Sequence, residues 1–127
     1  MEYRLWINGG WADSQDGGRM KIEDPATGAD IAEVVDSGRQ DVDQAVRAAE
    51  AAFYDGRWSR KTPSERSRAL LRMADLLESR SQEFARVESQ NTGKPYEYVS
   101  LGADMHFLID NLRFFAAAAR DVHGSHA

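Results

Sequence analysis

The stretch from Tyr96 to Arg120 limits the folds open to this sequence more than any other part. Four of its apolar residues cover well over half of a helical circumference: Phe107, Leu108, Ile109 and Leu112. A helix on the surface of a globular domain has a narrower apolar stripe, because its opposite face contacts water. We therefore expect a helix from about Tyr96 to Arg120 that is covered on most of its sides.

The rest of the chain offers little to cover this helix. The chain has 127 residues, and the remaining sequence predicts only two further helical segments and a small β-ribbon. Burial of apolar surface contributes about 25 cal/mol per Å², so a few uncovered side chains leave several kcal/mol of stabilising free energy unrealised. We therefore expect either a homo-oligomer formed through this exposed apolar helix or a segment that belongs to a larger protein.

Helical periodicity begins earlier, at Ser37. Ser37 and Gln40 have the spacing of a capping box, and Gly56 is placed to end the helix. Apolar residues recur along it at helical spacing: Val42, Val46, Ala49 and Phe53. The pattern predicts that this stripe is buried and that the acidic residues Asp41 and Asp43 lie on the solvated face.

A second helix is predicted from a start signal at residues 62–65. Thr62 is a capping residue, Pro63 suits the first helical position, and Glu65 completes a capping box. The expected buried stripe follows: Leu70, Ala74, Leu77, Phe84 and Val87. The helix should reach about Gln90, with a bend or break at residues 79–81.

Thr92, Gly93 and Lys94 are typical of phosphate-binding loops, but the surrounding residues do not fit one. A Walker-type loop needs a glycine five residues before Gly93, where this chain has Glu88, and a hydroxyl after the lysine, where it has Pro95. The preceding residues also read as helix rather than strand. We therefore interpret Gly93 as a left-handed helix end and Pro95 as the start of the next helix.

The first third of the chain favours short strands. Asn8 and Gly9 suit a tight hairpin turn, and alternating residues predict strands at 20–23 and 31–35 with a turn at 24–28 between them. The predicted organisation is a β-ribbon with turns over residues 1–36 and a three-helix region over residues 37–127. This segment is thus expected to be mainly α-helical with a short amino-terminal β-ribbon.

Composition excludes several classes of partner. The 16 basic and 21 acidic residues give a net charge of −5, without a long basic run, so a nucleic-acid partner is not expected. There is no apolar stretch of signal-peptide or membrane-spanning length, which predicts a cytoplasmic chain without a membrane partner. The absence of cysteine excludes thiolate catalysis within these residues. His123 and His126 are assigned to a chain-end tail rather than to a metal site.

Six strings occur in order along the chain: "LWINGGW", "DPATGADIAEV", "DVDQAVRAAEAAF", "W…TPSERSRALLRMADLLESR", "ESQNTGKPYEY" and "NLRFFAAAARDVHG". Their order and spacing resemble the amino-terminal quarter of the aldehyde dehydrogenase superfamily. Arg113-Phe114-Phe115-Ala116 within the last string is most similar to the aminobutyraldehyde and betaine-aldehyde branch.

The resemblance implies an α/β parent fold and an activity that this chain lacks by itself. Family members oxidise an aldehyde to the acid with NAD or NADP, through a cysteine thiolate, a glutamate base and a Rossmann-like cofactor domain. The Rossmann-like and catalytic domains are absent from this chain, which has no cysteine and no G-x-G-x-x-G run. We expect the segment alone to be non-catalytic and to bind no cofactor, with an aldehyde as substrate of the parent enzyme.

The resemblance also implies that the helix carrying the Arg-Phe-Phe-Ala string lines the aldehyde entrance. Asp104 and Phe107 match entrance-facing positions, where an acid in aminoaldehyde enzymes attracts the distal ammonium of the substrate. Phe107 departs from the second acid found in some of those enzymes. The alternatives are a solvated surface acid at Asp104 and a simple core residue at Phe107.

A monovalent cation site is the last feature that the resemblance implies. The matching positions are Ile22 and Glu23, through backbone carbonyls, and Asn91, where an acid is usual in the family. An amide oxygen can bind a hard cation, with less attraction than a carboxylate. A helix-terminal Asn91 with no ion is the alternative.

Two functions of different class follow from the sequence. The first is the amino-terminal segment of an NAD(P)-dependent aldehyde dehydrogenase, which acts on an aldehyde or aminoaldehyde. The second is a free-standing helical interaction or assembly module without catalysis, which covers its third helix by self-association.

Overall fold

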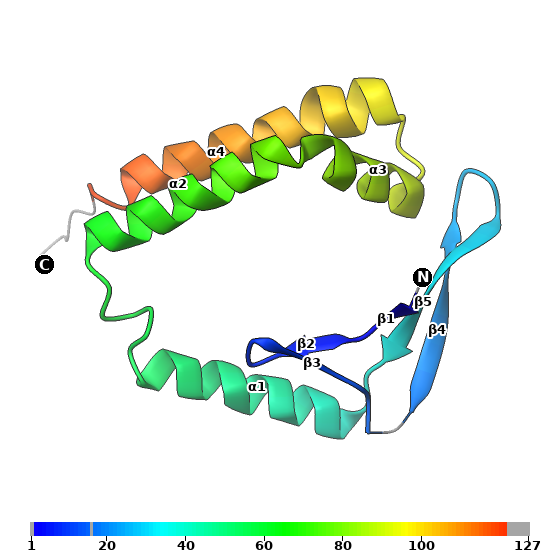
Figure 1. The fold of residues 1–127 in the computed structure, drawn as a ribbon, viewed down its shortest axis with the longest axis horizontal. Helices are drawn as coiled ribbons and strands as arrows, with labels where there is room; N and C mark the ends of the chain where they lie inside the picture. The colour runs from blue at the N-terminus through cyan, green and yellow to red at the C-terminus, as the bar shows by residue number, and fades with distance from the viewer. Residues whose placement is uncertain (1, 16, 122–127) are drawn as a thin grey trace, which may run out of the picture. The chain divides into compact units, whose positions relative to one another are not determined.

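The computed structural model describes residues 2–15 and 17–121 (Figure 1). The tail predicted at His123 and His126 lies outside these residues. The chain forms two compact units, Met1–Ser59 and Arg60–Ala127. The first helix therefore belongs with the strands, whereas the division expected from sequence placed the boundary after residue 36.

The first hairpin of the amino-terminal unit forms as the Asn-Gly signal predicts. Strands β2 (Leu5–Ile7) and β3 (Gly10–Ala12) pair antiparallel, with Trp6 opposite Trp11. Asn8 and Gly9 both have positive φ, at 53° and 78°. Asparagine and glycine tolerate this region better than other residues, which explains the tight turn.

A second sheet has three strands in the order β1-β5-β4. Strands β4 (Gly18–Asp24) and β5 (Ala29–Asp36) are antiparallel, and the short β1 (Glu2–Tyr3) pairs parallel to β5. The strands predicted at 20–23 and 31–35 are thus confirmed as parts of longer strands. The parallel partner β1 has no alternating pattern and was not predicted.

The N-cap of helix α1 (Arg39–Tyr54) lies one residue after the predicted cap. Its N-cap is Gly38 rather than Ser37, and the N3 position is occupied by Asp41 rather than Gln40. The backbone N–H of Gly38 donates to the Asp41 carboxylate at 3.0 Å, which satisfies one of the donors left free at a helix start.

The prediction that Asp41 is solvated is wrong. The Ser14 hydroxyl donates to its Oδ2 at 2.6 Å, the Gln15 N–H donates to its Oδ1 at 3.0 Å, and the residue is 2% exposed. These hydrogen bonds, led by the one from Ser14, hold the pKa of Asp41 below its usual value. Asp41 therefore joins the loop before β4 to the start of α1.

The apolar stripe of α1 is not buried within the chain. Val42, Val46 and Phe53 are 51%, 60% and 65% exposed. The stripe has the predicted helical spacing, but nothing in the described structure covers these three side chains.

The carboxy-terminal unit contains four helical segments: α2 (Pro63–Ser79), α3 (Ser81–Thr92), the π-helix η1 (Tyr96–Met105) and α4 (His106–Ala118). The predicted break near residue 80 is confirmed, because Arg80 leaves helical geometry between α2 and α3. The capping box is confirmed as well: Glu65 N–H donates to the Thr62 hydroxyl at 3.2 Å, and Thr62 N–H donates to the Glu65 carboxylate at 2.8 Å.

The core of this unit is a seam between α2 and α4, which lie side by side and run in opposite directions (Figure 1). Ala74 and Leu77 of α2 meet Ile109 of α4, with Leu112 packed against them. At the edge of the seam, Arg113 donates to Asp75 and Glu78 at 3.4 and 2.5 Å. No helix among the described residues has both the length and the apolar character needed to cross a membrane.

Candidate functional site

The junction between α3 and η1 contains the residues that the sequence singles out. Gly93 closes α3 in the left-handed region at φ 74°, and its N–H donates to the Ser89 carbonyl at 2.9 Å. Pro95 is the N-cap of η1. The interpretation of Gly93 and Pro95 as a helix stop and a helix start is therefore confirmed.

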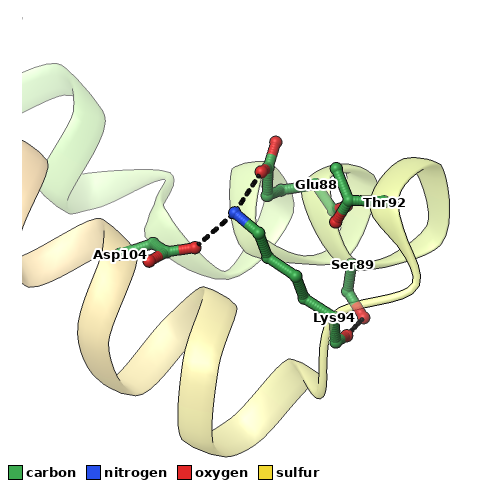
Figure 2. A network of polar contacts seen from close by, with 5 residues as sticks. All are labelled: Glu88, Ser89, Thr92, Lys94 and Asp104. Atoms are coloured by element: carbon green, nitrogen blue, oxygen red, sulfur yellow. Dashed lines mark hydrogen bonds and ion pairs between the residues drawn. The ribbon is translucent and has the colours of Figure 1, made fainter.

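Lys94 connects the two helical segments at this junction (Figure 2). Its Nζ donates to Glu88 Oε1 in α3 and to Asp104 Oδ2 in η1, both at 2.9 Å. Its backbone carbonyl accepts from the Ser89 hydroxyl at 2.6 Å. We refer to Glu88, Ser89, Lys94 and Asp104 together as the Lys94 junction.

The electrostatics of the junction keep Lys94 charged. The hydrogen bond to Asp104 and then the one to Glu88 raise the pKa of Lys94 above its usual value. A protonated amine is neither a nucleophile nor a general base, so the geometry favours a binding or structural role. The Asp104 carboxylate is paired with Lys94, which weakens its attraction for a cationic ligand compared with an unpaired carboxylate.

η1 has backbone geometry that is rare in proteins. The Pro95 carbonyl accepts from both Val99 N–H and Ser100 N–H at 3.1 Å, so an α-type and a π-type bond share one acceptor. A Cβ at Gly102 would lie 2.6 Å from the Glu97 carbonyl oxygen. Residue 102 therefore has to be glycine while this geometry is kept. The single continuous helix predicted from Tyr96 to Arg120 is thus a π-helix followed by an α-helix.

Phe107, the second residue of α4, is 73% exposed, so it is not a core residue of this chain. Phe114 lies seven residues further along α4 and is 65% exposed. The buried pair Ile109 and Ala116 has the same spacing but is displaced by two residues, which is about 200° around a helix. α4 therefore has two apolar faces, of which one packs on α2 and the other is uncovered.

A second uncovered apolar surface lies on α2 and α3. It is a groove of about 450 Å³. Its residues are Ala69, Arg72, Met73, Leu76, Leu77, Arg80 and Phe84. Leu76, which is 65% exposed, has its side chain on this surface rather than in the seam with α4. Phe84 was predicted to be buried and is instead 44% exposed.

The three residues of the predicted cation site lie on two elements, β4 and α3. Ile22 and Glu23 flank a register irregularity in β4 of the first unit, and Asn91 is an exposed residue near the end of α3 in the second. Within the described residues, no group of three or more His, Cys, Asp and Glu side chains is arranged to hold a metal ion. The monovalent site from Ile22, Glu23 and Asn91 stays a prediction.

Sequence reasoning missed Lys94 as the shared partner of Glu88 and Asp104. Glu88 and Asp104 lie six residues before and ten residues after Lys94, on two segments separated by a chain reversal. Helical spacing relates residues three or four apart and gives no signal for such a pair. The signal that was present is the unusual helix stop itself, because Gly93 and Pro95 turn the chain back on α3.

Comparisons with known proteins identify the family of this chain. The pattern described as the aldehyde dehydrogenase family matches residues 11–127. Aldehyde dehydrogenase family 2 member B4, mitochondrial, of Arabidopsis thaliana is 41% identical over 121 residues, which are 95% of this chain and 22% of that protein. Aminoacetaldehyde dehydrogenase of Pseudomonas aeruginosa is 40% identical over 124 residues, 98% of this chain and 25% of that protein.

A solved structure agrees with the sequence comparison. An NAD+ complex of aldehyde dehydrogenase from Bacillus cereus superposes with a TM-score of 0.91 at 33% identity, over 98% of this chain and 25% of that one. The chain thus spans about a quarter of the length of these relatives. This chain belongs to the aldehyde dehydrogenase family.

Proposed function

We propose that the chain is the amino-terminal segment of an NAD(P)-dependent aldehyde dehydrogenase, which it supports by packing beside the cofactor domain and the substrate entrance. The observation that carries the proposal is the match of nearly the whole chain to about a quarter of full-length enzymes. The reaction of the parent enzyme is the oxidation of an aldehyde to its carboxylic acid.

The uncovered apolar faces support a role inside a larger enzyme. Phe107 and Phe114 on α4, and Leu76 on α2, are each at least 65% exposed. Burying a side chain of this size contributes about 1.5–3 kcal/mol. Helices with apolar residues on two opposite faces suit an internal layer between two other parts of a protein.

The substrate proposal is an aminoaldehyde. It is supported by the similarity to aminoacetaldehyde dehydrogenase and by the acid at Asp104. Because Lys94 compensates the Asp104 charge, we expect Asp104 to make a modest contribution to the attraction of an ammonium group. Phe107, which is exposed beside it, provides an apolar surface for the substrate chain.

The cofactor proposal is NAD or NADP for the parent enzyme, supported by the NAD+ complex of the similar Bacillus cereus enzyme. The residues of this chain do not themselves fit a dinucleotide. The connection from β5 to α1 has no G-x-G-x-x-G run, and the Asp41 carboxylate lies at the start of α1, where a phosphate would need hydrogen-bond donors. The segment alone is therefore proposed to bind no cofactor.

The test measures aldehyde-dependent NADH or NADPH formation by the complete gene product and by the 127-residue chain. We expect activity with aminoaldehydes from the complete product, and none from the chain alone because it contains no cysteine. Reproducible turnover by the pure chain would disprove the non-catalytic role. A complete product that oxidises no aldehyde would disprove the proposed activity.

A complementation experiment tests the packing role. A related dehydrogenase lacking its own matching segment is co-expressed with this chain, and we expect the two to co-purify with restored activity. A matched control carries Phe114→Asp, which places a charge on the uncovered face of α4. Equal recovery with both chains would contradict packing through α4.

The alternative is a free-standing helical module that assembles through the same face of α4. The exposed Phe107, Phe114 and Phe115 also suit such a surface. A gene product that ends with this segment and forms a soluble oligomer of defined size would favour the alternative. The cytoplasmic location stays a prediction that cell fractionation can test.

A further inference from the structure

We propose that Lys94 is a positioning residue: its bridge from Glu88 to Asp104 holds residues 96–105 in the π-helical register and so sets the direction of Asp104 relative to the seam between α2 and α4. The proposal concerns this chain's own geometry. Only its kinetic consequence rests on the proposed dehydrogenase function.

The first turn of η1 contains hydrogen bonds of both the α-helical and the π-helical register. The Pro95 carbonyl already accepts from Val99, as in an α-helix, and from Ser100, as in a π-helix. If the Ser100 N–H donated to the Tyr96 carbonyl instead of the Pro95 carbonyl, a regular α-helix would start there without loss of a backbone hydrogen bond. Two helical registers are therefore available to the same residues.

The π register has costs that local sequence does not offset. Ser100 is completely buried, and its hydroxyl has no hydrogen-bond partner within the described part of the chain. An unpartnered buried hydroxyl is destabilising, because it has lost its hydrogen bonds to water without replacement. Gly102, which the close approach of the Glu97 carbonyl requires, loses more conformational entropy on folding than any other residue. An interaction outside η1 has to favour this register.

The Lys94 bridge is placed to supply that interaction. Lys94 is tied to α3 twice, by its carbonyl to Ser89 and by its Nζ to Glu88. Asp104 comes eight residues after the start of η1, and a π-helix contains more residues per turn than an α-helix. An α-helix from the same start would rotate Asp104 away from Lys94, so the ion pair favours the π register (Figure 2).

The register matters because α4 continues η1 without a break. Ile109 has to face Ala74 and Leu77 on α2 while Asp104 faces Lys94. The wider turn of η1 allows both orientations in one continuous helix. With Ile109 held in the seam, the α-helical turn that Phe107 shares with Ile109 fixes Phe107, and the register of η1 determines the direction of Asp104.

The structural test compares crystal structures of the complete gene product carrying Lys94→Met, Lys94→Arg or Lys61→Met. Lys61 is the matched control, because it is an exposed lysine paired with Glu65 on the same unit. We expect Ser100 N–H to bond to the Tyr96 carbonyl in Lys94→Met, and to the Pro95 carbonyl in Lys94→Arg and Lys61→Met. A retained Ser100–Pro95 bond in Lys94→Met would overturn the proposal.

Asp104→Asn is the second variant, for the case in which Lys94→Met does not fold. Asparagine keeps the shape of the aspartate side chain and removes its charge, so the α register should become populated and the η1 amides should exchange with solvent at least about threefold faster. Unchanged exchange across residues 96–105, relative to Lys61→Met, would overturn the proposal as well.

The kinetic test separates positioning from general loss of structure. We expect Lys94→Met to raise the KM for an aminoaldehyde about threefold to tenfold with kcat within about twofold, because Asp104 turns away, and Lys94→Arg to restore KM. A lower KM, from an Asp104 that stays in place without its compensating charge, or equal KM values despite a shifted register would refute the link to Asp104. A complete gene product without aldehyde activity would refute the proposed function, and the crystal structures would still decide the register.

Discussion

At the scale of single residues, Asp41 shows how a polar side chain can organise a unit with little apolar core. Its carboxylate accepts from Ser14, Gln15 and Gly38, and so connects a loop to the start of α1. The residue has the sequence appearance of a solvated helix position. Only the chain path that brings Ser14 to the helix start makes it the most completely buried charged group described in the unit.

The first prediction is that Asp41→Asn destabilises the amino-terminal unit, whereas Asp43→Asn does not. The introduced asparagine would replace one of the two carboxylate oxygens with an N–H₂ donor, and each of those oxygens accepts from a backbone N–H, of Gln15 or of Gly38. Asp43 is exposed on the same helix and provides the matched control. Thermal unfolding followed by circular dichroism should give a lower Tm for Asp41→Asn alone. Equal Tm values for the two variants would contradict the bridging role.

The second prediction concerns pH and the capping box of α2. Hydrogen bonds from Thr62, the backbone N–H first, lower the pKa of Glu65 from 4.5 to about 2. A carboxylate whose folded pKa is depressed stabilises the fold above its unfolded pKa, and that contribution is lost as pH falls through the folded pKa. The helix should thus lose stability between about pH 4.5 and pH 2.

Glu65→Gln is the variant that isolates this contribution. The stability of the wild-type chain should fall towards that of Glu65→Gln as the pH is lowered across this window, and urea unfolding at several pH values measures the difference. Glu50→Gln, at an exposed position of α1, serves as control. A wild-type to Glu65→Gln difference that is constant across the window would contradict the assignment.

At the scale of elements, the seam between α2 and α4 carries the packing of the second unit. The third prediction is that Leu77→Ala costs about 2–5 kcal/mol of unfolding free energy, because Leu77 is 8% exposed against Ile109. Leu76→Ala, at a position 65% exposed in the same helix, should cost less than about 1 kcal/mol in the isolated chain. Chemical denaturation of both variants tests this difference, and equal costs would contradict the assigned seam.

The elements that the sequence predicted are those with local causes. The Asn8-Gly9 turn, the Thr62 cap, the break near Arg80 and the end of α3 at Gly93 each depend on residues within one turn of the chain. The parallel strand β1 and the burial of Asp41 depend on partners far along the chain. The periodicity of apolar residues contains no information about those distant partners, so these features could not be predicted from it.

The candidate site was predicted in part for the same reason. The resemblance to aldehyde dehydrogenases identified Asp104 and Phe107, and the structure locates both at the end of η1 and the start of α4. It did not identify Lys94 as the partner of Asp104, because matching a family's motif transfers positions without their contacts. The entrance roles of Asp104 and Phe107 stay predictions.

At the scale of the whole molecule, the chain leaves many large apolar side chains exposed to solvent. The fourth prediction is that the isolated 127-residue chain self-associates and binds a hydrophobic dye through α4. Phe114→Ser should reduce both effects, because Phe114 and its T-shaped partner Phe115 lie on the uncovered face. Phe53→Ser is the matched control, since Phe53 on α1 has the same 65% exposure as Phe114.

Sedimentation velocity and dye fluorescence measure this fourth effect. A compact monomer without a dye signal would contradict the exposed face altogether. Association that is lost with Phe53→Ser and kept with Phe114→Ser would place the associating surface on α1 instead. In the complete gene product, Phe114→Ser should lower the Tm and leave the mass of the assembly unchanged, because the face is proposed to be covered there by the same polypeptide. A lower Tm with an unchanged assembly mass indicates a segment that packs inside a dehydrogenase, whereas a changed assembly mass indicates a module that assembles by itself.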